Sequence, residues 1–216
     1  MGERVDVVAP YAQFLSRPLQ AVVADLESYA GLLRKWQVIQ NLVSRETLEQ
    51  VWTRHFADSL QVLRYMRPTD RVIIDLGSGG GFPALPLAIA LQGEPIHFVL
   101  VEPNGRKVSF LRTVIRDLSL SATVVAKRTD QLDSRETGHV NLVTARAVAS
   151  LTALCAMAQP LFTPHTRAIF HKGREHLAEL AESRLVWEYR VVTHQSETDP
   201  NGVLLELNNL SIKTGS

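Results

Sequence analysis

One segment decides the fold of this 216-residue chain, Val72-Ile73-Ile74-Asp75-Leu76-Gly77-Ser78-Gly79-Gly80-Gly81-Phe82-Pro83. Its β-branched run before Asp75 predicts a buried strand, and four glycines within five positions predict a tight turn. Glycine reaches positive φ and lets the backbone approach a ligand, because it has no Cβ. Pro83 suits the first turn of a helix, where its missing N–H would have had no partner. The segment therefore predicts a strand, a turn and a helix whose unpaired N–H groups face whatever lies over the turn.

The spacing of the glycines indicates which ligand the turn holds. The dinucleotide fingerprint G-x-G-x-x-G needs a third glycine for close helix packing, and Phe82 stands at that position. The pattern Asp75-x-Gly77-x-Gly79-x-Gly81 resembles instead the first motif of S-adenosylmethionine-dependent methyltransferases with a Rossmann-like fold. This resemblance implies that the turn holds the methionine moiety and ribose of S-adenosylmethionine. A purely structural glycine turn is the alternative.

Composition and motif spacing exclude several classes of protein. The chain is 45% hydrophobic, which fits one domain. Its formal net charge of +1 does not by itself indicate a nucleic-acid-binding protein. A single cysteine, Cys155, excludes an internal disulfide and fits a reducing cytoplasm. The sequence has no secretion-type N-terminus and no apolar run of about 18 residues, so we expect a cytoplasmic protein without membrane spans.

Three further expectations rest on motifs that are missing from the sequence. The seven histidines lack metal-binding spacing, so we expect no metal. No G-x-S-x-G elbow supports a hydrolase triad. A monomer is expected, because no heptad pattern or large apolar surface helix stands out.

The order of patterns along the chain predicts an α/β protein with a helical N-terminal part. Apolar residues recur at helical spacing from Leu19 to Trp36 and again after Ser44, so residues 1–70 are expected to form a helical cap, with residues 1 to about 15 loosely held. Residues 71–216 then alternate strands and helices, which predicts one compact domain with a mostly parallel sheet covered on both faces. The expected strands are Val72–Leu76, Ile96–Val101, Ala122–Ala126, Val140–Thr144 and Arg167–His171.

A strong turn signal marks the C-terminal part of the chain. Asp199-Pro200-Asn201-Gly202 separates two strand-like runs, Val186–His194 and Val203–Leu207. We therefore expect a terminal hairpin that puts one antiparallel strand into a seven-stranded sheet, as the methyltransferase fold requires.

Candidate site residues follow the strands, because ligands of open α/β sheets bind beyond the carboxyl ends. Glu102 follows the second strand and can accept both ribose hydroxyls, as the matching acid of methyltransferases does; a solvated acid is the alternative. Thr129 and Asp130 follow the third strand and could meet the adenine. Arg146 follows the fourth strand in an apolar stretch, where a cation is costly unless it is paired or lies in an open cleft. A structural ion pair is the alternative for Arg146.

Several cations are expected on one rim of the sheet, and a phosphate-rich substrate with salt-sensitive RNA binding would follow from them. A solvated charged surface is the alternative. The rim residues are Arg106, Lys107, Arg128, Arg146, Lys172 and Arg174.

Four blocks of the sequence resemble the RsmG (GidB) family, bacterial enzymes that methylate N7 of a guanine in 16S ribosomal RNA. They are residues 32–42, Trp52 to Ser59, Asp75 to Pro83, and Thr144 to Ala147 with Lys172-Gly173 downstream. The R-H-x-x-D-S block is the most discriminating, because other methyltransferases have no such cap. The resemblance implies that His55 and Asp58 face the substrate cleft. Ala84, Asn141 and Gln37 depart from the family pattern, and Asn141 leaves open what would pair with a neighbouring cation.

The resemblance also implies roles for individual residues. Cofactor contacts carried over by position fall on Gly77, Phe82, Thr129, Asp130 and Arg146, and the general methyltransferase pattern adds Gly79 and Glu102. Arg146 is expected to orient cofactor and substrate, while Arg128 and Lys172 grip RNA phosphates or the guanine O6. The expected partner is 16S rRNA or a small-subunit particle. A small-molecule methyltransferase and a non-catalytic RNA- or nucleotide-binding module remain open.

Overall fold

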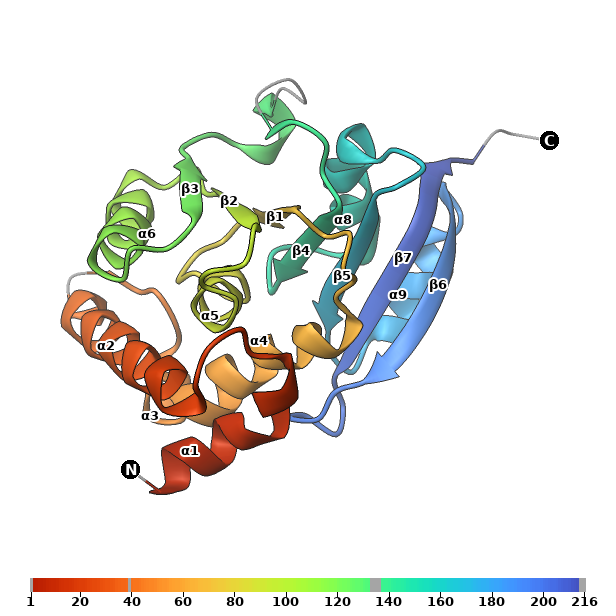
Figure 1. Cartoon of the computed structure of the whole chain (residues 1–216). Coiled ribbons are helices and arrows are strands. Elements are labelled where there is room, and N and C mark those ends of the chain that lie inside the picture. The colour runs from red at the N-terminus through yellow and green to blue at the C-terminus, as the bar shows by residue number, and fades with distance from the viewer. Residues whose placement is uncertain (1, 39, 133–136, 214–216) are drawn as a thin grey trace.

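The computed structural model describes residues 2–38, 40–132 and 137–213 and confirms the expected fold (Figure 1). Seven strands form one sheet in the order β3-β2-β1-β4-β5-β7-β6. Strands β1 to β5 run parallel, and β7 lies antiparallel between β5 and β6. The strands are β1 (Val72–Leu76), β2 (His97–Val101), β3 (Ala122–Val125), β4 (Leu142–Arg146), β5 (Arg167–Lys172), β6 (Trp187–Gln195) and β7 (Val203–Ile212).

Strand β4 begins and ends two residues later than expected. The Asn141 side chain precedes it and accepts hydrogen bonds from the backbone N–H groups of Arg71 and Val72, at 2.9 and 3.0 Å. Asn141 therefore anchors the start of β1 and pairs with no cation in these bonds. The shift makes Arg146 the last residue of β4, at the edge where ligands bind.

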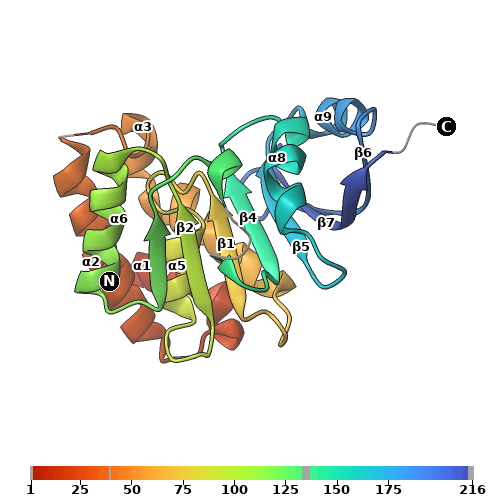
Figure 2. The same ribbon diagram turned by 90° about the horizontal axis from the view of Figure 1, so that it is seen from above.

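Helices cover both faces of the sheet. Helices α5 (Ala84–Ala90) and α8 (Leu151–Ala158) lie on opposite sides in Figure 2. Helix α6 (Gly105–Asp117) shares a core with α5, whereas the core under α8 includes the hairpin strands and is covered by α9 (His176–Ser183). Short turns of 3-10 helix, η4 (Thr129–Gln131) and η5 (Gln159–Leu161), follow β3 and α8.

The N-terminal cap is helical, as expected, but two details of the prediction were wrong. Residues before α2 (Leu19–Gln37) form α1 (Gly2–Val8) and η1 (Ala9–Phe14), and Val8 and Tyr11 are buried in the core. This run is too short for its apolar spacing to reveal a helix. The expected second helix is instead divided into α3 (Arg45–Glu49), a π-helical turn η2 (Trp52–Ala57), α4 (Asp58–Leu60) and the 3-10 turn η3 (Gln61–Tyr65).

The cap and the sheet share one hydrophobic core. Tyr29 of α2 packs against Phe56, Phe82 and Phe110, and its hydroxyl donates to the carbonyl of Gly80 in the glycine turn. The cap is therefore bonded directly to the segment that decides the fold. Within the described ranges, no helix has the length and apolar character that crossing a bilayer needs.

Candidate functional site

The glycine turn between β1 and α5 has the predicted backbone. Gly77, Gly79 and Gly81 have φ of +64°, +53° and +96°, which side chains rarely tolerate. A Cβ on Gly77 would lie 2.8 Å from the Val148 side chain, so this side of the turn is closed. A Cβ on Gly79 would meet only the Gly77 carbonyl, at 3.7 Å. Gly79 is therefore the open point of the turn.

Asp75 lies at the floor of the turn, and it was absent from the predicted contact residues. Its Oδ1 accepts from the Thr144 hydroxyl at 2.8 Å. Its Oδ2 is buried and has no hydrogen-bond partner within the described part of the chain. Burial raises the pKa of Asp75 to about 7, because a charged carboxylate is costly away from water. An acid at the end of a buried strand was the sequence signal for this role.

Glu102 flanks the same turn, at the end of β2. Its two carboxylate oxygens accept from the backbone N–H groups of Gly79 and Asn104, both at 2.9 Å. A carboxylate has about four lone-pair sites, so both oxygens can also accept from hydroxyl groups. Glu102 thus supports the turn and remains able to take the expected ribose contact.

Thr129 and Asp130 lie in η4, at the end of the sheet edge strand β3. They line a cavity of about 250 Å³ whose other walls are mostly apolar. Asp130 also pairs with Arg128 at 3.2 Å, and both side chains are exposed. The other lining residues are Leu132, Ala153, Ala156, Met157, Pro160 and Leu161. A flat ring could therefore pack against the apolar walls of the cavity, with the Asp130 carboxylate beside it.

Arg146 is held by three groups of the R-H-x-x-D-S block. Its Nε lies 2.7 Å from Asp58 Oδ2, one terminal nitrogen lies 2.7 Å from His55 Nδ1, and the other donates to the Arg54 carbonyl at 2.7 Å. The guanidinium carbon also lies 5.9 Å from the centre of the Phe82 ring. The ion pair considered from the sequence therefore exists, and it joins the cap to the end of β4.

The protonation of His55 follows from these contacts. Arginine can only donate, so His55 Nδ1 must accept and the ring proton must lie on Nε2. Burial and the neighbouring Arg146 lower the pKa of His55 to about 3, which keeps the ring neutral. The ring stacks on Phe82 with centroids 4.6 Å apart. The neutral His55 ring thus contacts both Arg146 and Phe82.

A cleft of about 320 Å³ opens beside Arg146, and we refer to it as the Arg146 cleft. Residues from the cap, the ends of β4 and β5, and the β6–β7 turn form its walls, so segments far apart in sequence meet there. The lining residues are Asp58, Arg146, Ala147, His171, Lys172, Gly173, Ser196, Asp199, Gly202 and Val203.

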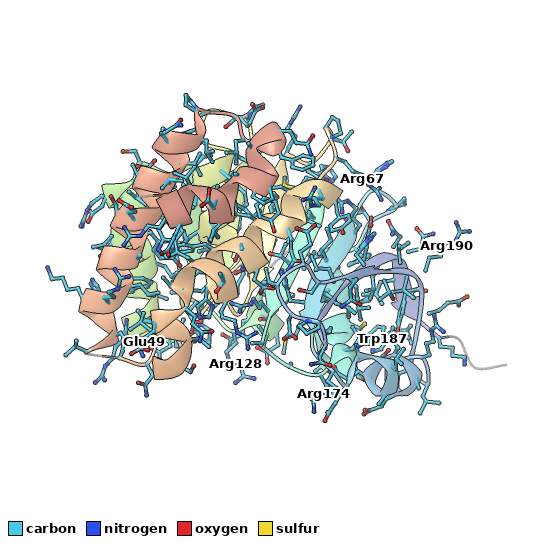
Figure 3. The ribbon with its side chains drawn as sticks, turned by 90° about the horizontal axis from the view of Figure 1, so that it is seen from below. Glu49, Arg67, Arg128, Arg174, Trp187 and Arg190 are labelled. Atoms are coloured by element: carbon cyan, nitrogen blue, oxygen red, sulfur yellow. The ribbon has the colours of Figure 1, made fainter. Side chains whose placement is uncertain are left out.

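The predicted basic rim is divided by the structure. In Figure 3, which looks at the molecule from below, Arg128 and Arg174 both lie at the lower margin. Lys172 points inward: it is 8% exposed, lies 2.5 Å from Glu179 and donates to the Ala149 carbonyl. Arg106, Lys107 and Arg174 have no carboxylate partner among the residues with described placement. These three cations, together with Arg128, form the outward part of the rim.

Comparisons with known proteins identify the family to which this arrangement corresponds. The family model for rRNA small subunit methyltransferase G (GidB) matches residues 22–200. The ribosomal RNA small subunit methyltransferase G of Rhodospirillum centenum is 45% identical over 186 residues, 86% of this chain and 83% of the relative. That of Cereibacter sphaeroides is 40% identical over 188 residues, 86% and 90% of the two chains.

Solved structures with little sequence identity share the fold. An S-adenosylmethionine-dependent methyltransferase from Aquifex aeolicus matches with a TM-score of 0.56 and 12% identity, covering 81% of this chain and 97% of that chain. A fibrillarin/Nop5p complex matches with a TM-score of 0.56 and 14% identity, covering 71% and 79%.

Proposed function

The chain belongs to the rRNA small subunit methyltransferase G family, and from this premise we propose how its residues carry out the family reaction. The reaction transfers a methyl group from S-adenosylmethionine to N7 of a guanine in 16S rRNA. Guanine N7 has an available lone pair, so no residue has to remove a proton. Catalysis therefore depends on positioning and electrostatics.

The residues of the glycine turn fit S-adenosylmethionine. The unpartnered Asp75 Oδ2 can accept from an ammonium group, and an ammonium would in turn favour the charged carboxylate. The open side of Gly79 admits a ligand close to the backbone, and Glu102 can accept from ribose hydroxyls. We assign the methionine end to Asp75, Gly77, Gly79 and Phe82. The adenine is assigned to Thr129 and Asp130, whose cavity has apolar walls.

Arg146 orients the guanine in this proposal, and Asp58 balances its charge. When bound, S-adenosylmethionine supplies a methyl group on a positively charged sulfonium, and the base gains positive charge as it is methylated. An uncompensated cation beside these groups would oppose both binding and reaction. The contact of 2.7 Å with Asp58 makes the Arg146 pair neutral as a whole, while two of its five N–H groups remain for substrate.

The other predicted cations take different roles. Arg128, Arg106, Lys107 and Arg174 face outward and are proposed to contact RNA phosphates. The ammonium of Lys172 is bound to Glu179, which favours positioning the end of β5 beside the Arg146 cleft over a phosphate contact. The proposal includes a monomer that acts on 16S rRNA in the cytoplasm.

The Arg146 contacts carry this proposal, and an Arg146→Ala variant tests it. We expect methyl transfer to 16S rRNA to fall by roughly a hundred- to a thousandfold, as when one preorganised donor is removed from a transition state. Circular dichroism should show an intact fold. Near-normal turnover would remove Arg146 from the catalytic residues.

Two assays separate the competing functions. Mass mapping of 16S rRNA from a strain that lacks the protein should show an unmethylated guanine, whereas a small-molecule methyltransferase would leave the rRNA unchanged. Calorimetric titration with S-adenosylmethionine should show binding, which a non-catalytic RNA-binding module would lack.

A further inference from the structure

The turn between β6 and β7 forms one wall of the Arg146 cleft and is held firmly against the cap. The Thr198 hydroxyl donates to Asp58 Oδ1 at 2.7 Å, and the backbone N–H of Glu197 donates to Gln61 Oε1 at 3.0 Å. Within the turn, the N–H of Gly202 donates to the Asp199 carbonyl at 2.9 Å. The cap and the turn are therefore bonded through Asp58, the same residue that holds Arg146.

Asp199 is one of the residues that line this cleft. One carboxylate oxygen accepts from the backbone N–H of Asn201 at 2.9 Å, which fixes the orientation of the side chain. The other oxygen lies 3.8 Å from a terminal nitrogen of Arg54, too far for a hydrogen bond. The side chain is 40% exposed, so a ligand can reach it.

The charges of the cleft indicate what kind of group it accepts. Each charged side chain that lines the cleft has an oppositely charged neighbour. These pairs are Arg146 with Asp58, Lys172 with Glu179, and Asp199 with Arg54. A phosphate is best bound by cations without such partners. A neutral ring with both donors and acceptors on its edges suits a cleft that offers both guanidinium N–H groups and a carboxylate.

We propose that Asp199 recognises the target guanine by accepting from its N1–H and N2 amino groups, while the free N–H groups of Arg146 donate to O6. This assignment rests on the proposed function. Arg146 lines the cleft and its guanidinium also lies over the Phe82 ring, so a guanine whose O6 accepts from Arg146 is held beside the glycine turn, with N7 adjacent to O6. Adenine is rejected, because its N1 would direct a lone pair at the carboxylate and it lacks the 2-amino group.

The test pairs a change in the enzyme with a change in the base. 16S rRNA carrying inosine at the target position lacks only the 2-amino group. We expect the wild-type protein to favour guanine over inosine by roughly five- to a hundredfold in kcat/KM, the range for a good hydrogen-bonded base contact. Asp199→Ala should lower kcat/KM for guanine and treat the two substrates alike, and Asp199→Asn should discriminate only partly.

Controls make the result decisive. Asp117→Ala removes another exposed carboxylate paired with arginine, at the end of α6, and should keep the full discrimination. Titration with S-adenosylmethionine should show unchanged affinity in Asp199→Ala, which establishes that the variant is folded. Equal discrimination by the wild type and Asp199→Ala overturns the assignment. A wild-type protein that methylates neither RNA would instead contradict the proposed function itself.

Discussion

The glycine turn and the Arg146 network form the two halves of the proposed site, and they are built in different ways. The turn consists of consecutive residues from Asp75 to Pro83. The network joins Arg146 to His55, 91 residues away in sequence, and Asp58 to Thr198, 140 residues away. Backbone conformation dominates the first half, and charge pairing across the fold dominates the second. The two halves should therefore fail for different reasons.

Removing the carboxylate of Asp58 should produce the largest effect of the three changes that follow. Asp58→Ala leaves Arg146 without its charge partner in a mostly buried position, and the freed guanidinium loses its orientation. We expect kcat for methyl transfer to fall by roughly a hundredfold, while the dissociation constant for S-adenosylmethionine changes by less than about threefold. Single-turnover kinetics and calorimetry measure the two quantities.

A matched variant tests whether the position of Asp58 is what matters. Asp25 of the cap also pairs with an arginine, Arg17, at 2.5 Å, and Asp25→Ala should leave kcat unchanged. If Asp58→Ala weakened cofactor binding as strongly as it slowed transfer, the separation of the site into two halves would be incorrect.

A change in the glycine turn should instead weaken cofactor binding. Gly79→Ala places a methyl group on the open side of a residue with φ of +53°, where the cofactor approaches. Affinity for S-adenosylmethionine should fall by roughly thirtyfold, and the strained φ should lower the free energy of unfolding by about 1–2 kcal/mol.

Gly138→Ala is the control for the strain. Gly138 has φ of +66° and also has open space around its Cβ position, but it lies in the loop before β4, at the opposite end of the strands from the turn. The two variants should unfold at similar denaturant concentrations and differ in cofactor affinity. Equal affinities would show that the cofactor does not lie over Gly79.

The pH dependence of cofactor binding gives the smallest effect. The pKa of Asp75 is raised to about 7, mainly by burial. An ammonium group binds the ionised carboxylate, so binding releases a proton and affinity rises with pH until the pKa of the free protein is passed. Between about pH 6 and pH 7.5 we expect affinity to rise roughly eightfold. Asp75→Asn should abolish this slope in calorimetric titrations, and an unchanged slope would assign the titration to another group.

Most of the glycine turn and the sheet could be predicted from the sequence. Strand β1 follows from a β-branched run. The positive φ values of the turn follow from the glycines at positions 77, 79 and 81, because glycine adopts positive φ readily. The odd position of Arg146 in an apolar stretch was also visible. The family resemblance placed His55 and Asp58 at the substrate cleft, but nothing in local spacing indicated that this part of the cap meets Arg146 at the end of β4.

Other features depended on contacts that no local pattern contains. The segment around Val8 and Tyr11 is ordered by burial, and the Tyr11 hydroxyl donates to Glu197 across 186 residues of sequence. Lys172 follows a strand and was expected to face RNA, yet Glu179 one helix later neutralises it. The role of Asp199 also emerged only once the β6–β7 turn was placed beside Arg146.

The sequence by itself determined the cofactor half of the site, because strand, turn and helix start are set by the conformational preferences of neighbouring residues. The tertiary structure decided the acceptor half. Charges separated by about a hundred residues or more become partners only when packing brings them together and removes the water between them. In the proposed site, the turn therefore holds the methyl donor, and the folded cap and hairpin hold the acceptor.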